Sequence, residues 1–576
     1  MEKYFNNAII GNSNILGCIT DRGELIRLYY PNIDYFQNID MYNYGIIFDN
    51  KVKWLSDANL ISQYYDTNIL YTELESDNVK VIQKDYVLSD KNILVRKLAF
   101  NKNVDLFLYS RLNSNVNRLI SGMVVQDTLM QYCQEFYMST FSNKGISNYQ
   151  INNANFDNFN LDNRDYVGMS PSAAIKYDNI NEITLYVSFE RTLHDALDSI
   201  ENIKNVPETK LCEKTKQYWN KYINDINVKE IQTSSQKEKD ILIRTAYMFS
   251  LLTNKNTGGV LASPDVDETF SKCGRYGYCW PRDALFIMKA FALLGMNEQV
   301  ERFYNVWATK AQLNSGLFEQ RYYVNGELAP SWGLQIDETA AMLIGINKYG
   351  KCRKLENVIV KATEALLGFL DDRFVSKECY DLWEERKGTH LYSTASIYEA
   401  LNSSKDMLHK IDRIKYKNII TTIEKILPKI NTAIKNLFVE NNKLKRSVDN
   451  TQIDMSLLSV VTPFNIFEIN DPLVTSAVND IETRLKLPNG GYMRYEGDAY
   501  MGGNAWIISS LWLSLYYIKA GNKERAKELF DWVTNHADNL NFLPEQIDRN
   551  SDRTAWVVQL AWSHAMYVIV RNELKE

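Results

Sequence analysis

The chain contains two stretches, Ala284-Leu285-Phe286-Ile287-Met288 and Leu511-Trp512-Leu513-Ser514-Leu515, that are apolar at nearly every position. Each covers more than one helical turn, so neither leaves a polar face for water. A helix of this kind is buried on every side and needs other elements all round it. The fold must therefore surround several such helices with other helices.

Similar apolar runs recur along the second part of the chain. They begin near Asp283, Asp337, Leu391, Ile453, Asn504 and Ala555, at intervals of 51 to 62 residues. More charged, amphipathic stretches lie between them, for example residues 297–310 and 523–536. Gly295, Gly350 and Gly521 stand where helices are expected to end. Six buried helices with six outer partners predict an (α/α)6 barrel.

An open stack of helical pairs is the alternative, because six units of this length fit either architecture. Most of the apolar runs follow a loop that is rich in Trp, Asp, Glu and Arg. In a closed ring these loops converge at one mouth, whereas in an open stack they spread along a groove. The loop composition favours the ring.

The first part of the chain has a different pattern. Short apolar or alternating runs, such as Ala8–Ile10, Val79–Ile82, Leu94–Phe100, Val104–Tyr109 and Glu182–Phe189, are separated by Asn, Asp and Gly clusters. This pattern is typical of an antiparallel β-sandwich. We therefore predict a multidomain protein, β then α, with a β-sandwich over residues 1–192, a helical linker over 193–235 and the barrel over 236–576.

Composition excludes several classes of protein. A chain of 576 residues that is 45% hydrophobic and 24% charged is globular and large enough for two domains. The net charge of -6 comes without a basic stripe, so nucleic acid is not an expected partner. No apolar run is long enough to cross a bilayer, and residues 1–7 do not resemble a signal peptide. The seven cysteines are scattered and odd in number, which suits free thiols. We expect a cytoplasmic protein without a membrane partner.

Two acidic segments carry the chemistry. They are Asp381-Leu382-Trp383-Glu384-Glu385-Arg386 and Leu543-Pro544-Glu545-Gln546. Two carboxylates that face each other across a pocket can cleave a glycosidic bond, one as acid and one as base. An indole beside a carboxyl favours its protonated form, which a general acid needs. The alternatives are helix-capping charges for the paired glutamates and a plain loop carboxylate for Glu545.

Three further loops suit the binding of a sugar. Arg282 and Asp283 can grip hydroxyl groups as donor and acceptor, or Asp283 is only a helix cap. Trp332 beside Gly333 is a stacking platform or a core anchor. Arg494 follows a Gly-rich turn as a fixed donor, or is simply exposed. The five histidines form no ligand pair and the chain has no phosphate loop, so we expect no metal and no cofactor.

Taken together, these loops resemble glycoside hydrolase family 15, the glucoamylase-like family, in its bacterial and archaeal branch. The resemblance rests on Trp280-Pro281-Arg282-Asp283, on the segment 381–385, and on an Arg-Tyr … Tyr … Gly-Asn-x-Trp pattern that ends at Trp506. It implies Glu384 as the catalytic acid and Glu545 as the catalytic base. It implies substrate contacts for Tyr276, Trp280, Arg282, Asp283, Trp332, Trp383, Glu385, Arg494, Tyr495, Tyr500 and Trp506.

The expected activity is inverting, exo-acting hydrolysis that releases β-glucose from the nonreducing ends of α-glucosides such as maltodextrins. Trehalose and isomaltose are alternative substrates on the same fold. A disaccharide phosphorylase is a second alternative, although it needs no carboxylate base and Glu545 argues against it. A catalytically silent sugar-binding protein is the third.

Overall fold

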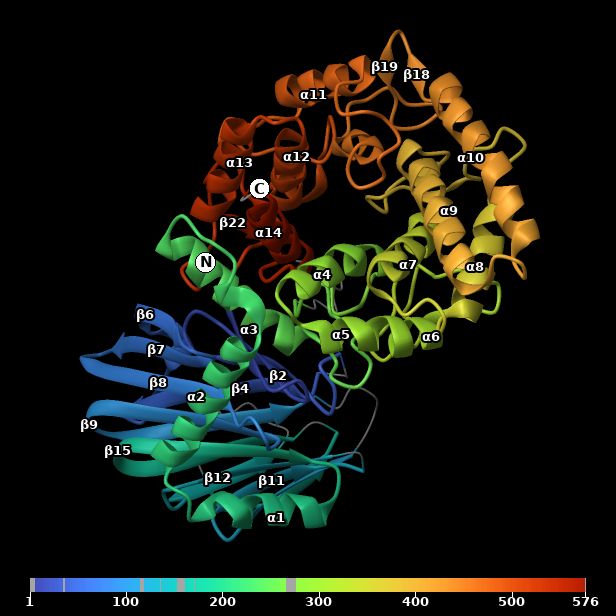
Figure 1. Ribbon diagram of the computed structural model, residues 1–576. Coiled ribbons are helices and arrows are strands. Elements are labelled where there is room, and N and C mark those ends of the chain that lie inside the picture. Colours follow the sequence, from blue (N-terminus) through green and yellow to red (C-terminus); the bar gives the residue numbers. More distant parts are fainter. Residues whose placement is uncertain are drawn as a thin grey trace. The chain divides into compact units, whose positions relative to one another are not determined.

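The chain divides into a first unit built mainly of strands and a second unit built mainly of helices (Figure 1). The computed structural model describes residues 6–34, 37–113, 119–134, 136–152, 161–169, 171–265 and 276–574. The first unit comprises residues 1–225 and 247–252, and the second comprises residues 226–246 and 253–576.

The first unit is antiparallel throughout its described strands. The strand order is β1-β2-β3-β4-β9-β15-β12-β11-β10-β14, with β5 on β4, β6 on β7, β7 on β8, β8 on β9 and β13 on β15. The strands are β1 Ala8–Gly11, β2 Leu16–Ile19, β3 Leu25–Tyr29, β4 Ile39–Phe48, β5 Lys51–Trp54, β6 Asn59–Asp66, β7 Ile69–Ser76, β8 Val79–Val87, β9 Ile93–Leu112, β10 Ile120–Val125, β11 Thr128–Tyr132, β12 Tyr137–Ser142, β13 Asn148–Asn152, β14 Tyr166–Gly168 and β15 Ser172–Glu190.

Two long strands, β9 and β15, join the parts of this sheet. The sequence predicts separate strands at Leu94–Phe100 and Val104–Tyr109, but both lie in β9. The polar residues 101–103 between them are exposed, and the register of the facing strand β15 shifts between Tyr177 and Glu182. The polar residues therefore mark a bulge and not a turn.

Helices α1 (Leu193–Lys204) and α2 (Glu208–Asp225) complete the first unit. Ile203 and Leu211 pack into the same core as Tyr86, Val95 and Phe141 of the strands. The Lys84 ammonium pairs with Glu208, and the Tyr86 hydroxyl donates to the same carboxylate at 2.9 Å.

In the second unit, the inner elements form a closed ring among the described residues (Figure 1). Its members are α4 (Pro281–Leu293), α7 (Ile336–Tyr349), α9 (Leu391–Asp412), the 3-10 helix η4 (Met455–Val460), α12 (Ile507–Lys519) and α14 (Ala561–Glu573). Each packs on the next, and α14 packs on α4. This closure excludes the open stack of helical pairs.

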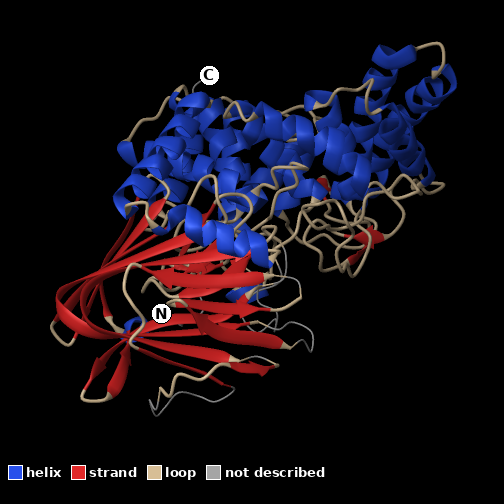
Figure 2. Cartoon of the chain, turned by 90° about the horizontal axis from the view of Figure 1, so that it is seen from below, coloured by secondary structure: helices blue, strands red, loops and turns tan. Residues whose placement is uncertain are grey.

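Outer helices surround the ring. They are α3 (Gln236–Leu252), α5 (Asn297–Arg302) with the π-helix η3 (Phe303–Trp307) and α6 (Ala308–Ala311), α8 (Glu356–Gly368), α10 (Lys417–Leu437), α11 (Pro472–Arg484) and α13 (Lys523–Asn535). Figure 2 shows the loops and short strands of this unit gathered at one end of its helices. These short strands are β16 (Cys379–Tyr380), β17 (Lys387–Gly388), β18 (Val439–Glu440), β19 (Lys443–Leu444), β20 (Ala505–Trp506), β21 (Gln546–Ile547) and β22 (Thr554–Trp556).

The ring departs from the sequence pattern at three places. The run that begins near Ile453 forms only the six-residue η4, because Pro463 follows it closely. The last inner helix begins at Ala561, because β22 occupies the residues after Arg553. Gly295 and Gly521 have the positive φ of a helix end, but Gly350 is extended at φ -85°. A Cβ at Gly350 would lie 2.9 Å from the Ile346 carbonyl oxygen, so glycine is required there by close approach.

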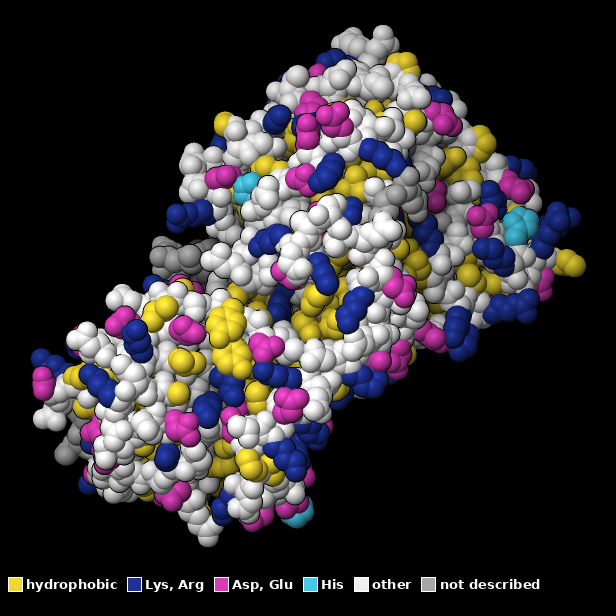
Figure 3. All heavy atoms as spheres, turned by 60° about the vertical axis from the view of Figure 1, so that its left-hand side comes forward, with side chains coloured by type: hydrophobic (Ala, Val, Ile, Leu, Met, Phe, Trp, Pro, Cys, Tyr) yellow, Lys and Arg dark blue, Asp and Glu magenta, His cyan; other side chains and the backbone are white. Residues whose placement is uncertain are grey.

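Within the described parts of the chain, no helix is long and apolar enough to cross a membrane. Acidic and basic side chains are interspersed over the face that Figure 3 shows. The six described cysteines are free thiols, and Cys273 lies outside the described residues.

Candidate active site

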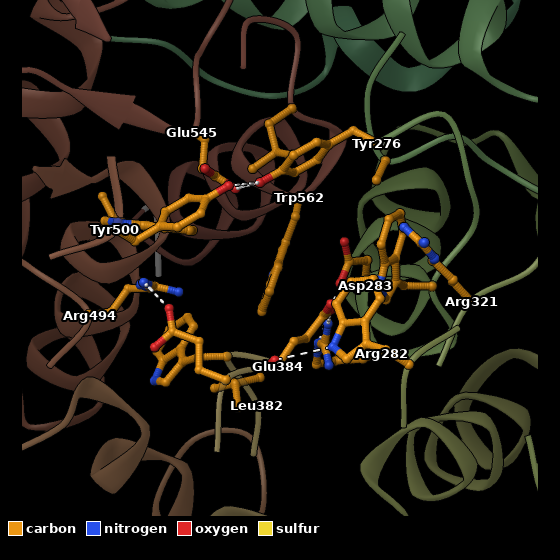
Figure 4. A pocket seen from close by; sticks show the side chains of 17 residues that line it. Tyr276, Arg282, Asp283, Arg321, Leu382, Glu384, Arg494, Tyr500, Glu545 and Trp562 are labelled. Carbon is orange, nitrogen blue, oxygen red and sulfur yellow. Dashed lines mark hydrogen bonds and ion pairs between the residues drawn. The ribbon is translucent and has the colours of Figure 1, made fainter. Parts of the chain in front are cut away.

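A cavity of about 310 Å³ lies within the helical unit (Figure 4). Its lining comes from the loops that precede the inner helices and from the first turns of α4 and α14. The lining residues are Ala262, Tyr276, Trp280, Arg282, Asp283, Arg321, Trp332, Leu382, Trp383, Glu384, Glu385, Arg494, Tyr500, Trp506, Glu545, Leu560 and Trp562. Glu384 and Glu545 stand on opposite sides of the cavity.

Arg282 and Asp283 lie in the first turn of α4. Trp280 is the N-cap and Pro281 opens the helix, so Asp283 is not the cap. The Arg282 guanidinium lies 3.0 Å from Glu384 and 3.0 Å from Glu338, and 3.4 Å from Asp337. Burial raises the pKa of Asp283 to about 7, although Arg282 opposes this rise.

Glu384 lies in the hairpin turn between β16 and β17. The paired glutamates are therefore not the capping charges of α9, which begins at Leu391. Asp381 shapes the turn, because its carboxylate accepts from the backbone N–H groups of Glu385 at 2.9 Å and Arg386 at 3.1 Å. Glu384 has φ +66°, which is uncommon for a residue with a side chain.

Two donors hold the Glu384 carboxylate. Arg282 Nη2 donates to Oε1 at 3.0 Å, and Gln320 Nε2 donates to Oε2 at 2.7 Å. The indole of Trp332 donates to the Glu384 carbonyl oxygen at 3.3 Å. These contacts aim the half-buried carboxyl into the cavity (Figure 4).

Glu545 is buried, with 3% of its surface exposed, so it is not a plain loop carboxylate. The Tyr276 hydroxyl donates to Oε1 at 2.9 Å and Gln546 Nε2 donates to Oε2 at 2.9 Å. Burial raises the pKa of Glu545 to about 7, and these two hydrogen bonds limit the rise. The small sheet β20-β21-β22 fixes its backbone, since Trp506 faces Gln546 across the ladder.

Arg494 is buried and not exposed at the Gly-rich turn. It donates twice to Asp498, at 2.9 Å each, and to Glu385 at 2.7 Å. Its guanidinium lies 4.4 Å from the ring centre of Trp506 and 5.1 Å from that of Tyr500. The protein itself therefore uses most of the hydrogen-bonding capacity of Arg494.

Trp332 stands at the cavity rim with 48% of its surface exposed, so it is not a core anchor. The Arg321 guanidinium lies 4.7 Å from its ring centre and 4.5 Å from that of Tyr278. On another wall, Trp562 stacks on Phe286 at 5.3 Å. Aromatic faces of this kind suit the apolar faces of sugar rings.

The structure brings twelve of the thirteen sequence-predicted site residues together as lining of the cavity. Tyr495 does not line it but contacts it indirectly, because its hydroxyl donates to Glu385. Sequence reasoning missed Ala262, Arg321, Leu382, Leu560 and Trp562. Trp562 stands at the start of an inner helix, as other site residues do, and that position could have signalled it; Arg321 belongs to no such pattern.

The described residues contain no group of three or more His, Cys, Asp or Glu side chains that could hold a metal ion. The acidic side chains around Arg282 are instead held by that guanidinium.

Comparison with known proteins agrees with this picture. Residues 236–530 match the model of glycosyl hydrolases family 15. An uncharacterized glycosyl hydrolase of Methanocaldococcus jannaschii is 27% identical over 98% of each chain. An isomaltose glucohydrolase of Kribbella flavida is 23% identical over 52% of this chain and 85% of its own. A solved bacterial glucoamylase in complex with acarbose has a TM-score of 0.85 at 16% identity, and the match covers 100% of this chain and 94% of that one. The last match confirms the predicted fold class of a β-sandwich followed by an (α/α)6 barrel.

Proposed function

The chain belongs to glycosyl hydrolase family 15, and from this premise we propose that it is an inverting, exo-acting α-glucosidase. It would remove single glucose units from the nonreducing ends of short α-glucans such as maltodextrins. The observation that carries the proposal is the placement of Glu384 and Glu545 on opposite sides of one cavity (Figure 4).

Glu384 is assigned the role of general acid. It must hold a proton and deliver it to the glycosidic oxygen as the bond to C1 breaks. Its carboxyl reaches the cavity from a turn that Asp381 fixes, and the Trp332 indole donates to its backbone carbonyl oxygen. A fixed donor position lowers the cost of orienting the proton in the transition state.

Glu545 is assigned the role of general base. It must be ionised to take a proton from a water molecule that attacks C1 on the opposite face of the ring. With a pKa of about 7, Glu545 is half ionised near neutral pH and is basic enough to accept that proton. Its two hydrogen bonds leave it directed toward the cavity.

Asp283 is the group best placed to bind the terminal glucose. Its carboxyl group lines the cavity, so a sugar hydroxyl there can hydrogen-bond to it. Arg494 contributes mainly by holding Glu385, since Asp498 takes two of its donors. The aromatic walls around these groups suit a pocket for one sugar ring.

The decisive measurement is the anomeric form of the first product. Fresh glucose from a maltodextrin digest, read by NMR before mutarotation, should be the β-anomer, because attack by water inverts C1. Initial α-glucose would contradict the inverting mechanism. Maltose or longer oligomers as first products would contradict exo-action.

The substrate is tested with a panel of maltose, isomaltose and trehalose, each with and without inorganic phosphate. We expect glucose release that does not depend on phosphate, with maltose or longer maltodextrins preferred. Glucose 1-phosphate as the product would indicate the phosphorylase. Absence of turnover with all three, together with sugar binding, would indicate a silent binding protein.

The two roles are separated by Glu384→Gln and Glu545→Gln. Each should keep the fold and lose roughly 10²–10⁴-fold in kcat, as expected for an acid or a base. A glucoside with a very good leaving group should partly rescue Glu384→Gln alone, because that bond needs no proton to break. Equal rescue of both variants would show that the roles are wrongly assigned. Glu301→Gln, at an exposed position of α5, is the control.

A further inference from the structure

Arg446 is a buried arginine that lies outside the lining of the cavity, with 4% of its surface exposed. It follows the short strand β19, and its main chain runs beside the residues that follow β17. The Leu391 N–H donates to the Arg446 carbonyl oxygen at 2.9 Å, and the Val448 N–H donates to the Thr389 carbonyl oxygen at 3.1 Å. Arg446 is thus held next to the hairpin β16–β17, whose turn carries Glu384.

The first partner of the Arg446 side chain is Asp381, which is also buried. Arg446 Nη2 donates to Asp381 Oδ2 at 2.8 Å. The other carboxylate oxygen, Oδ1, accepts from the backbone N–H groups of Glu385 at 2.9 Å and Arg386 at 3.1 Å. Asp381 therefore connects the Arg446 guanidinium to the backbone of the turn between β16 and β17.

The second partner is Asp454, the N-cap of η4. Arg446 Nη1 forms an ion pair with Asp454 Oδ2 at 3.2 Å. The Trp383 indole donates to the same carboxylate, 3.0 Å from Oδ1 and 3.2 Å from Oδ2. The carboxylate also accepts from the Ser456 N–H at 2.8 Å, so η4 fixes its position. Trp383, which lines the cavity, is in this way connected to Arg446.

Charge and burial both favour this arrangement. The two carboxylates, Asp381 and Asp454, are matched by two guanidinium groups, since Arg386 also lies 3.4 Å from Asp381. Removal of one partner from a buried pair leaves an uncompensated charge, so the contacts of Arg446 are costly to break. Arg446, Asp381 and Asp454 do not line the cavity, so their contacts reach it through Trp383 and the turn.

We propose that Arg446 is a positioning residue for the proposed reaction: through Asp381 and Asp454 it fixes the β16–β17 turn and Trp383 against each other at the cavity. This inference rests on the proposed function, because the turn carries the residue assigned as acid. Arg446 suits this role because its planar guanidinium has donors on separate nitrogens that can contact two carboxylates at once. A lysine would keep the charge, but its single nitrogen cannot offer the same two-sided contact.

The first test is steady-state kinetics of Arg446→Lys on a maltodextrin. The buried positive charge remains, but the turn and Trp383 lose their common anchor. A small displacement of the groups around a reacting bond is costly, so kcat should fall by roughly 10–100-fold. KM should change little, because Asp283 and Trp562 line the cavity from α4 and α14 and are left in place. An unchanged kcat would overturn the proposal.

Arg571→Lys is the matched control. Arg571 is likewise buried, with 8% of its surface exposed, and it pairs with Glu238 at 2.9 Å and donates to the Ser234 hydroxyl at 3.3 Å. These partners lie on α3 and just before it, not on a loop of the cavity. Both lysine variants should lower Tm, whereas only Arg446→Lys should lower kcat. A purely structural role for Arg446 would make the two variants alike, with a lower Tm and the same kcat in each.

A double-mutant cycle with Trp383→Phe tests the contact through Asp454. Phenylalanine keeps an aromatic ring but has no N–H to donate to Asp454. If Arg446 acts partly through Trp383, the loss of kcat caused by Arg446→Lys should be smaller in the Trp383→Phe background than in the unaltered protein. Equal losses in the two backgrounds would overturn the connection through Asp454.

The last test needs no activity. Two backbone amides of the turn donate to Asp381, so hydrogen exchange of peptides that cover residues 381–388 reports how firmly the turn is held. Exchange there should be faster in Arg446→Lys and unchanged in Arg571→Lys, and unchanged exchange in both would overturn the proposal. If no α-glucoside is hydrolysed, the proposed function fails, and this measurement still decides whether Arg446 holds the turn. If Arg446→Lys does not fold, Asp381→Asn takes its place, because it keeps an oxygen for the turn amides and loses the ion pair.

Discussion

Glu545 is a buried carboxyl group, and its raised pKa limits the pH range in which it can act as the proposed base. Because its pKa is about 7, half of the molecules lack the ionised form of this proposed base at neutral pH. The acid limb of the kcat/KM profile should therefore lie near pH 7, with activity falling about tenfold for each further unit toward acid. An acid limb near pH 4.5 would show either that Glu545 is not the base or that water reaches its carboxyl group and removes the effect of burial.

The hydrogen bond from Tyr276 to Glu545 allows a second prediction about the pKa of Glu545. The Tyr276 hydroxyl stabilises the ionised form of Glu545, so Tyr276→Phe should raise the base pKa and move the acid limb to higher pH. Tyr500→Phe is the matched variant, since the Tyr500 hydroxyl lies 3.3 Å from that of Tyr276, which is the hydroxyl that donates to Glu545. Tyr500→Phe should move the limb less. An equal shift in both variants would contradict the direct role of Tyr276.

Site residues differ in how far the sequence reveals them. Arg282, Asp283 and Glu384 stand in short motifs whose order along the chain matches a family pattern, so they could be predicted. Asp337 and Glu338 read as ordinary acidic residues in the first turn of a helix, and only the packing of α7 on α4 shows that they bind Arg282. Arg321 reaches the cavity from a loop without a recognisable pattern. Such contacts depend on the tertiary fold, which spacing alone does not give.

At the scale of elements, α14 holds the segment that carries Glu545. The Leu543 N–H donates to His564 Nε2 at 2.8 Å, and the Ser563 hydroxyl donates to the Pro544 carbonyl at 2.9 Å. Since Nε2 must accept, Nδ1 carries the hydrogen and donates to the Thr245 hydroxyl at 2.6 Å. Burial lowers the pKa of His564 to about 3, so the ring stays neutral.

This arrangement predicts that His564 positions the base without touching substrate. His564→Leu should leave the buried Leu543 N–H without an acceptor, at a cost of about 1–3 kcal/mol in stability. Displacement of Glu545 should lower kcat by up to about 10²-fold with little change in KM. His564→Gln, which retains an acceptor, should recover part of both losses. Thermal denaturation and steady-state kinetics provide the comparison, and an unchanged kcat in His564→Leu would contradict the positioning role.

The inner helices show what periodicity can and cannot predict. The two runs that are apolar at nearly every position correctly predicted α4 and α12 as buried helices. The run near Ile453 is equally buried but forms only η4, which shows that burial specifies apolar residues and not helix length. Pro463 was the available sign of an early end.

At the scale of the whole molecule, the division into two units has a measurable consequence. A protein of two units need not unfold in one step. Glucose at about 100 times its Kd should stabilise the unit that binds it by roughly 2.7 kcal/mol. Calorimetry should therefore show two transitions, of which glucose raises only that of the helical unit. A single transition that moves as a whole would show that the units unfold together.

Closure of the ring by α14 on α4 also bears on how the protein is made. Lys289 of α4 pairs with Glu573 of α14, which is 284 residues further along the chain. At a synthesis rate of about 5–20 residues per second, roughly 15–60 s pass before the ribosome supplies the helix that covers α4. During that interval the apolar surface of α4 that α14 will bury stays open to other chains and to chaperones. A chain that ends after α12 would keep most of its core-forming residues, but it would lack Glu545 and the helix that covers α4. The yield of folded protein in the cell therefore depends on α14, as the proposed activity does.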